Sequence, residues 1–239
     1  MNAMNHVKVQ GLLFEMDDVL HDATLWRRWL LQLLARMGLN TRYRSFFRVW
    51  DDEYLDDVHC GRREMSEAFR SFLLAAGLTH AQIDEVVAAA VARKRHLDAT
   101  LRPLPGVRTT IERLAERGVV LGVLTDSERS GDELRQTLRG LGLGDRFSVV
   151  LSSLDLERTK PDAFCYRSAL GLMGLEARHV AFVGHAAEDL HGARRAGLRT
   201  VAFHRATGVT AGHHLNRFDE LLSLVEPARA RASALSQAV

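Results

Sequence analysis

Two acidic side chains stand two residues apart at the end of the first apolar run of the chain. The run reaches Phe14 and is followed by Glu15, Met16 and Asp17. On an extended backbone, residues two apart point to the same side, so these two carboxylates should face one space. Such a pair can supply a nucleophile, a metal ligand or a general acid and base. Solvated acids of an ordinary turn are the alternative interpretation of this segment taken alone.

Three further segments carry reactive or charged side chains at the edges of predicted helices and strands. They are Thr125-Asp126-Ser127, Thr159-Lys160-Pro161-Asp162, and the stretch 184–189 with His185 and Asp189. Each has an ordinary interpretation: Thr125 as a helix N-cap, Lys160 as a surface cation, and Asp189 as a first-turn acid favoured by the helix dipole. Their combination with Glu15 and Asp17 favours one functional site.

The elements that must position these residues are short buried strands alternating with helices. Apolar or β-branched runs predict strands over 7–14, 119–124, 147–151, 180–183 and 200–203. The alternation predicts a mainly parallel sheet with helices on both faces, joined by right-handed crossovers. Ligands of such sheets bind at the carboxyl ends of the strands, and Glu15, Thr125 and His185 all follow or end a predicted strand.

One long interval, 23–99, contains no convincing strand and only helical periodicity. Apolar residues recur at helical spacing over 25–37, and further helices are predicted over 42–58, 66–76 and 80–96. The tryptophans at 26, 29 and 50 fit this periodicity, so we assign them to a helical core and not to a substrate. The interval predicts an inserted helical domain.

The chain returns to the strand and helix pattern after Pro103 and Pro105, with helices predicted over 107–117 and 218–225. The fold class predicted is α/β: a Rossmann-like three-layer parallel-sheet core with an inserted all-helical cap. We expect the core over 1–21 and 100–225, the cap over 22–99 and a frayed tail over 226–239.

Composition excludes several classes of function. The 239-residue chain carries 32 lysines and arginines against 30 aspartates and glutamates, scattered and not gathered in a stripe, so we expect no nucleic-acid partner. No run approaches the roughly 18 apolar residues of a membrane span, and the first ten residues lack a secretory signal, so we expect no membrane association. Cysteines at 60 and 165 form no disulfide framework, which favours the cytoplasm. The oligomeric state does not follow from the sequence.

Taken in chain order, the four polar segments resemble the four motifs of the haloacid dehalogenase-like superfamily, in its phosphatase-type branch with a helical cap. The second motif matches Thr125, and the third matches Lys160 with Pro161. The first motif aligns with Glu15, Asp17, Asp18, Val19 and Leu20. The fourth motif aligns with Gly184, Asp189, Gly192, Ala193, Ala196 and Gly197. The segment 104–107, Gly118 and the place of the insertion resemble the family as well.

The resemblance implies hydrolysis of a small phosphate ester. The first acid would attack phosphorus, and the second would protonate the leaving group and then activate water, while Mg²⁺ steadies the charge. The expected catalytic residues are Glu15, Asp17, Thr125 and Lys160. Thr125, Asp126 and Lys160 are the expected substrate-binding residues. The implied metal ligands are Glu15, Asp17, His185 and Asp189, and the expected partner is a small phosphorylated molecule.

Three residues depart from the family pattern. Glu15 replaces the nucleophilic Asp, and its extra methylene moves the carboxylate by on the order of 1 Å, a misplacement that can cost roughly 100-fold in rate. His185 replaces an Asp at the metal, and imidazole is a poor ligand for Mg²⁺. Asp18 replaces Gly, which adds a side chain and negative charge in a tight turn.

Three accounts of these departures stay open. Protonated His185 and Lys160 could neutralise Glu15 and Asp17 in place of a metal. Mn²⁺ or Zn²⁺ could bind through Glu15, His185 and Asp189. Metal-free cleavage of a carbon–halogen bond, as in the dehalogenase branch of the superfamily, ranks third. Those enzymes also use an Asp nucleophile, which this chain lacks. Two functional hypotheses follow. The first is a phosphatase-type hydrolase with weak or altered metal dependence. The second is an inactive pseudoenzyme that holds no metal and binds a phosphorylated ligand or a protein.

Overall fold

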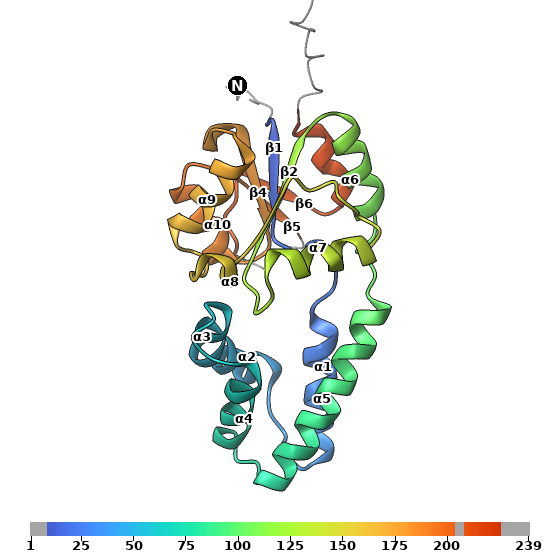
Figure 1. The fold of residues 1–239 in the computed structure, drawn as a ribbon, viewed down its shortest axis with the longest axis vertical. Helices are drawn as coiled ribbons and strands as arrows, with labels where there is room; N and C mark the ends of the chain where they lie inside the picture. Colours follow the sequence, from blue (N-terminus) through green and yellow to red (C-terminus); the bar gives the residue numbers. More distant parts are fainter. Residues whose placement is uncertain (1–8, 204–207, 226–239) are drawn as a thin grey trace, which may run out of the picture.

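The computed structural model describes residues 9–203 and 208–225, and within them one six-stranded sheet forms the centre, with all its strands parallel (Figure 1). The central strand β1 (Gly11–Phe14) pairs on both sides, with β2 and β4. A strand in this position is covered on both faces, which explains its continuous apolar sequence. In spatial order the others are β3 (Val149–Ser152) and β2 (Val120–Thr125) on one side, and β4 (Val180–Gly184), β5 (Arg199–Phe203) and β6 (His213–Leu215) on the other.

Side chains of β1 alternate between two layers of helices. Leu12 and Phe14 face one layer and Leu13 faces the other. Phe14 stacks on Phe218 and meets Phe147 edge-on. The first layer holds α6 (Val107–Glu116), α7 (Gly131–Gly140) and the 3₁₀ helix η3 (Phe218–Ser223), and the second holds α9 (Ala163–Met173) and α10 (Ala187–Arg195). The predicted Rossmann-like α/β core is confirmed.

Residues 24–100 contain helices only, and these form a separate body beyond the carboxyl end of β1 (Figure 1). They are α1 (Thr24–Arg36), α2 (Tyr43–Trp50), η1 (Asp51–Leu55), α3 (Asp56–His59), α4 (Met65–Ala75) and α5 (His80–Thr100). Their apolar faces share a core that includes Leu30, Phe72 and Val86. We call this body the cap. None of the described helices is long and apolar enough to cross a membrane.

Two linkers join the cap to the sheet, and they are bound to each other. His21 in the first linker pairs with Pro103 in the second through an isolated antiparallel bridge. The backbone N–H of Leu104 donates to the carbonyl of Leu20 at 2.9 Å. The cap therefore begins and ends next to the residues that follow β1. The predicted domain boundaries fall beside these linkers and stay predictions.

Several predicted elements differ from those observed. The strand β6 was not predicted, because His213–Leu215 is a three-residue edge strand with no apolar run. The single helix predicted over 42–58 is interrupted by the wider π-helical turn η1. The predicted helix 218–225 is the short 3₁₀ helix η3. Residues 7 and 8 of the first predicted strand, and the predicted tail 226–239, lie outside the described residues.

Candidate active site

Three neighbouring strands end at one edge of the sheet and carry three of the predicted site residues. Glu15 follows β1, Thr125 ends β2, and His185 follows β4. The registers Phe14 with Val123 and Phe14 with Val183 align these ends. The carboxyl ends of adjacent parallel strands thus meet under the cap, as the sequence predicts for a ligand site.

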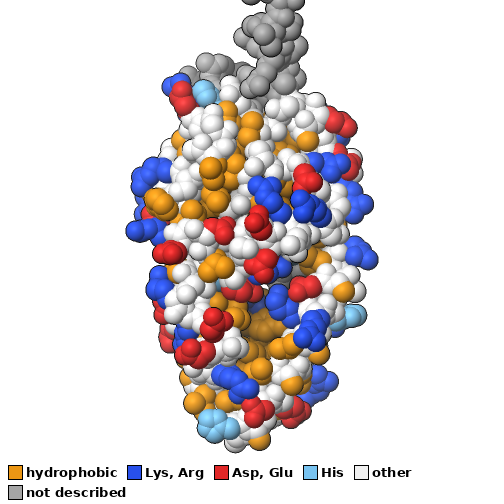
Figure 2. Space-filling model, in the orientation of Figure 1, with side chains coloured by type: hydrophobic (Ala, Val, Ile, Leu, Met, Phe, Trp, Pro, Cys, Tyr) orange, Lys and Arg blue, Asp and Glu red, His pale blue; other side chains and the backbone are white. Residues whose placement is uncertain are grey.

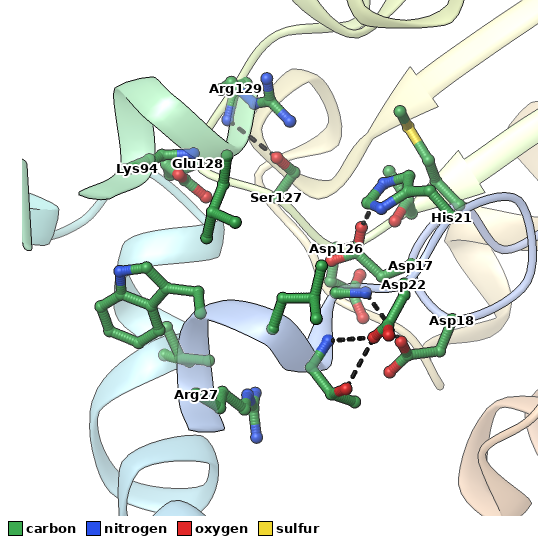
Figure 3. A pocket seen from close by; sticks show the side chains of 18 of the residues that line it. Asp17, Asp18, His21, Asp22, Arg27, Lys94, Asp126, Ser127, Glu128 and Arg129 are labelled. Atoms are coloured by element: carbon green, nitrogen blue, oxygen red, sulfur yellow. Dashed lines mark hydrogen bonds and ion pairs between the residues drawn. The ribbon is translucent and has the colours of Figure 1, made fainter. Parts of the chain in front are cut away.

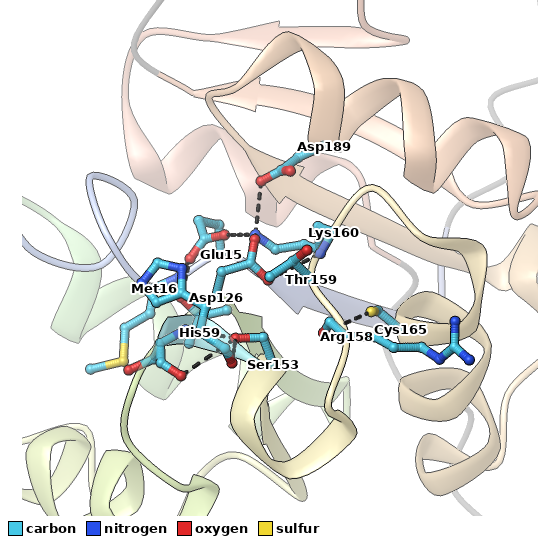
Figure 4. A network of polar contacts seen from close by, with 12 residues as sticks. Glu15, Met16, His59, Asp126, Ser153, Arg158, Thr159, Lys160, Cys165 and Asp189 are labelled. Atoms are coloured by element: carbon cyan, nitrogen blue, oxygen red, sulfur yellow. Dashed lines mark hydrogen bonds and ion pairs between the residues drawn. The ribbon is translucent and has the colours of Figure 1, made fainter. Parts of the chain in front are cut away.

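The carboxylate of Glu15 is fully engaged by hydrogen-bond donors (Figure 4). Its Oε1 accepts from the Thr125 hydroxyl and from the backbone N–H of Met16, the latter at 2.7 Å. Its Oε2 accepts from the Lys160 ammonium. The side chain is buried, with 4% of its surface exposed. The predicted nucleophile, hydroxyl and ammonium are therefore in direct contact.

Lys160 lies among three carboxylates. Its Nζ also contacts Asp189 Oδ2 at 2.8 Å and Asp126 Oδ2 at 3.2 Å, and its backbone N–H donates to Asp126 Oδ1 at 3.0 Å. Burial alone would lower the pKa of Lys160, but the charges of Asp189, Glu15 and Asp126 raise that pKa well above its ordinary value. The ammonium keeps its proton and supplies positive charge at the centre of the site.

The pKa of Glu15 is also shifted, because the carboxyl group is buried in a site that holds more acids than cations. Burial raises the pKa of Glu15 to about 7, and the nearby Asp189 and Asp126 act in the same direction, while Lys160 opposes them. Near neutral pH the Glu15 side chain therefore exchanges between carboxylate and carboxylic acid. Only the carboxylate can act as a nucleophile.

Asp17 forms an ion pair with His21, and not with His185. His21 Nε2 lies 3.1 Å from Asp17 Oδ1, and the Asp17 side chain keeps 54% of its surface exposed (Figure 3). Enclosure would raise the pKa of Asp17, but the hydrogen bond and charge of His21 lower it. Burial would lower the pKa of His21, but Asp17 raises it. The pair favours an aspartate carboxylate beside an imidazolium.

Asp18 shows how the chain accommodates a residue where the family has glycine. Its φ of 56° lies in the left-handed region, which is costly for a residue with a side chain. The carboxylate accepts a hydrogen bond from the backbone N–H of Ala23 at 2.9 Å, a local bond that favours this conformation. Asp18 also lines the cavity described below and adds negative charge there.

The arrangement of the predicted metal ligands does not form a metal site by itself. Within residues 9–203 and 208–225, no three His, Cys, Asp or Glu side chains are grouped so that they could hold a metal ion. The Lys160 ammonium lies between the carboxylates of Glu15 and Asp189. His185 Nδ1 is buried without a hydrogen-bond partner among the described residues. In this arrangement the residues do not fit Mg²⁺, and the ligand set Glu15, Asp17, His185 and Asp189 stays a prediction.

The cap contacts the core beside the site through Thr159 and through three residues that the sequence did not indicate, Asp56, His59 and Ser153. The hydroxyl of Ser153 donates to the carbonyl of His59 in the cap at 2.8 Å and accepts from the backbone N–H of Ser127 at 2.9 Å. Thr159 donates to Asp56 of the cap. The His59 imidazole lies near Asp126 in Figure 4. Burial lowers the pKa of His59, although the charge of Asp126 opposes this.

These residues were missed for an identifiable reason. His59 and Ser153 are 94 positions apart and stand in no motif, so only the docking of the cap brings them together. His21 did carry a signal, because it lies four residues after Asp17 and beside the first motif.

A cavity of about 1180 Å³ lies between cap and core and contains the site. Glu15, Asp17, Thr125, Lys160 and Asp189 line its core side. Its opening is the hollow in the lower half of Figure 2, where hydrophobic side chains show inside. The opposite wall comes from three helices of the cap. Trp26 lies in α1, Phe69 in α4, and Val91 and Leu97 in α5.

Two phosphoglycolate phosphatases are among the proteins whose sequences are similar to this chain. The phosphoglycolate phosphatase of Pectobacterium atrosepticum is 32% identical over 121 residues, which is 51% of this chain and 47% of that protein, so this match spans about half of each. The phosphoglycolate phosphatase of Yersinia pseudotuberculosis is 26% identical over 212 residues, covering 86% of this chain and 83% of the relative.

Solved structures share the fold. The HAD-hydrolase YfnB from Bacillus subtilis, solved bound to magnesium, superposes with a TM-score of 0.68 at 16% identity, and the match covers 91% of this chain and 99% of that chain.

The model of the haloacid dehalogenase-like hydrolase family matches residues 12–203. That span runs from β1 to the end of β5 and includes all four motifs. The chain therefore belongs to the haloacid dehalogenase-like hydrolase family.

Proposed function

We propose that this protein hydrolyses a phosphate monoester with weak or altered metal dependence. The observation that carries the proposal is the direct contact of Glu15 with the Thr125 hydroxyl and the Lys160 ammonium. Phosphoryl transfer depends mainly on positioning and on neutralising the charge of the phosphoryl oxygens. A hydroxyl and a buried ammonium beside a carboxylate provide both.

The proposed reaction has two steps. A Glu15 oxygen attacks phosphorus, the ester P–O bond breaks, and an acyl phosphate forms on Glu15 while Thr125 and Lys160 hold phosphoryl oxygens. The departing alkoxide takes a proton from the Asp17 and His21 pair, in which His21 carries the proton. Water then attacks the acyl phosphate, gives its proton to Asp17, and releases phosphate and free Glu15.

A second candidate is a protein that binds a phosphorylated ligand without turnover. Both oxygens of Glu15 accept hydrogen bonds from the groups that would hold the phosphoryl oxygens. The longer side chain therefore competes with the phosphoryl group for Thr125 and Lys160. This competition favours slow chemistry or none.

Turnover measurements separate the two candidates. The wild type, Glu15→Asp, Glu15→Gln and the double variant Glu15→Asp/His185→Asp are assayed on a panel of phosphate monoesters without metal and with Mg²⁺, Mn²⁺ or Zn²⁺. The proposal expects slow turnover by the wild type, its loss in Glu15→Gln, and a gain of roughly 100-fold in Glu15→Asp, since about 1 Å of misplacement costs that much. Turnover by the double variant alone would support the second candidate. Equal rates in all four would show that Glu15 is not catalytic.

A further inference from the structure

The cap side of the cavity carries exposed hydrophobic side chains beside its charged ones. Leu25 is 44% exposed and Val91 is 48% exposed, and both line the cavity. Trp26 packs on Phe69 with ring centroids 5.6 Å apart, and both rings also border the cavity. Large apolar side chains left exposed inside a concave site indicate an apolar ligand surface.

The charges that line the cavity are predominantly negative. The lining contains eleven Asp and Glu residues against five Lys and Arg residues. One of the five, Lys160, is already shared by three carboxylates. A ligand that brings a second anionic group into this space would meet net repulsion, because the walls of a cleft concentrate the field of the charges that line it.

The cations of the cap are already paired. Arg27 of α1 makes a bidentate ion pair with Asp51, at 2.8 and 2.7 Å, and its guanidinium also lies over the ring of Phe47. Lys94 of α5 pairs with Asp98 at 3.5 Å. These two helices therefore bring no unpaired lysine or arginine to the cavity that could bind a carboxylate of a substrate.

The remaining two cations, Arg102 and Arg129, each make one side-chain hydrogen bond inside the protein, and the charge of Arg129 already acts on the Asp17 carboxylate, whose pKa it lowers. Arg102 in the linker donates to the carbonyl of Leu101 at 2.8 Å. One terminal nitrogen of Arg129 donates to the Thr137 hydroxyl at 3.0 Å, while its Nε is buried and has no hydrogen-bond partner among the described residues. In Figure 3, Arg129 lies on the core side of the pocket, away from Arg27.

We infer that the substrate is a phosphate monoester of a bulky apolar alcohol, aromatic or branched, that carries no second anionic group. The inference rests on the proposed function and names the substrate class of the same site. The cavity of about 1180 Å³ exceeds the roughly 300–1,000 Å³ of most sites for drug-sized ligands, so it has room for such a group. Phosphoglycolate, which carries a carboxylate beside its phosphate, is predicted to be a poor ligand.

Calorimetric titration of the full chain at constant ionic strength tests this inference. The probes are 1-naphthyl phosphate, phosphoglycolate, inorganic phosphate and 1-naphthol. We expect 1-naphthyl phosphate to bind at least about tenfold more tightly than inorganic phosphate, since the naphthyl group leaves water, and phosphoglycolate to bind more weakly than inorganic phosphate.

A double variant assigns the effect to the cap wall. Leu25→Ser/Val91→Ser should weaken 1-naphthyl phosphate at least about fivefold and leave inorganic phosphate unchanged. Leu172→Ser, at a 65% exposed site on α9 outside the cavity, is the matched control and should change neither.

The outcomes separate this inference from the proposed function. Equal affinity for 1-naphthyl phosphate and inorganic phosphate, tighter binding of phosphoglycolate, or an unaffected double variant would overturn the inference alone. Binding of 1-naphthol that is sensitive to the double variant, with no phosphate bound, would overturn the proposed function and support the apolar subsite. No binding of any probe would overturn both.

Discussion

At the scale of single residues, one buried ammonium holds the site together. Lys160 neutralises part of the charge of Glu15, Asp126 and Asp189, which lie within contact distance of it. A buried ion pair that loses one partner leaves an uncompensated charge and costs about 3–5 kcal/mol. The same ammonium is the group we expect to hold a phosphoryl oxygen, so stability and function depend on one side chain.

Replacing Lys160 by Met should therefore destabilise the fold by about 3–5 kcal/mol at pH 8 and by less at pH 5, where the carboxylates can take up protons. Urea unfolding at the two pH values measures this. Lys94→Met is the control, because that ion pair is solvent-exposed and should contribute about 1 kcal/mol or less. A loss no larger than that of Lys94→Met would contradict the assigned role of Lys160.

Glu15 should make stability depend on pH. Its pKa is about 7 in the folded chain against the ordinary 4.5, so the folded state binds a proton more tightly than the unfolded state. The resulting stabilisation is complete below pH 4.5 and is lost as the pH rises through about 7, by on the order of 3 kcal/mol. The difference in unfolding free energy between wild type and Glu15→Gln, followed from pH 4.5 to 8, isolates this contribution. A flat difference would show that the Glu15 pKa is not raised.

At the scale of elements, close packing of α10 against the loop after Lys160 fixes the site. A Cβ added at Gly192 would lie 2.8 Å from Pro161 Cβ and 2.9 Å from both Pro161 O and Tyr166 Cε2. The Tyr166 hydroxyl donates to the carbonyl of Asp189 at 2.7 Å, so the same contact positions Asp189 beside Lys160. This explains a glycine at that point of the fourth motif.

Gly192→Ala is accordingly expected to destabilise the chain by about 1–3 kcal/mol, because overpacking forces neighbouring atoms to shift. Gly171→Ala in α9 is the matched control, since nothing lies within 4 Å of its added Cβ, and it should stabilise by roughly 0.5–1 kcal/mol. Thermal or urea unfolding compares the two. Similar effects of both substitutions would refute the packing argument.

The sequence predicted elements well where the pattern was strong. Leu12, Leu13 and Phe14 form an apolar run typical of a doubly covered strand, and the strand was predicted to end where it does, at Phe14, although it begins at Gly11 and not at residue 7. Prediction failed at His213–Leu215, whose strand pairing depends on the neighbouring Arg199–Phe203 and not on its own composition. The contact between Glu15 and Lys160 could be expected from the family resemblance. The pairing of Asp17 with His21 depends on the backbone conformation of the turn between them, which the sequence does not reveal.

At the scale of the whole molecule, the space between cap and core determines what can bind. The size of the cavity depends on how the cap helices lie beyond the carboxyl end of the sheet, which no local pattern gives. Trp26 illustrates the limit. Its spacing predicted a core position, and it does pack on Phe69, but the cap also presents it to the cavity.

The central claim is that Thr125 and Lys160 hold a phosphoryl group next to Glu15. Titration of inorganic phosphate into the wild type, Thr125→Val and Lys160→Met, followed by ³¹P NMR, tests it most directly, with Lys94→Met as a control in the same cavity. We predict that the wild type and Lys94→Met bind alike, and that Thr125→Val and Lys160→Met each lose about tenfold or more, since hydrogen bonds to charged groups contribute about 1.5–3 kcal/mol. Equal affinity in all four proteins, or no binding by the wild type, would contradict the claim.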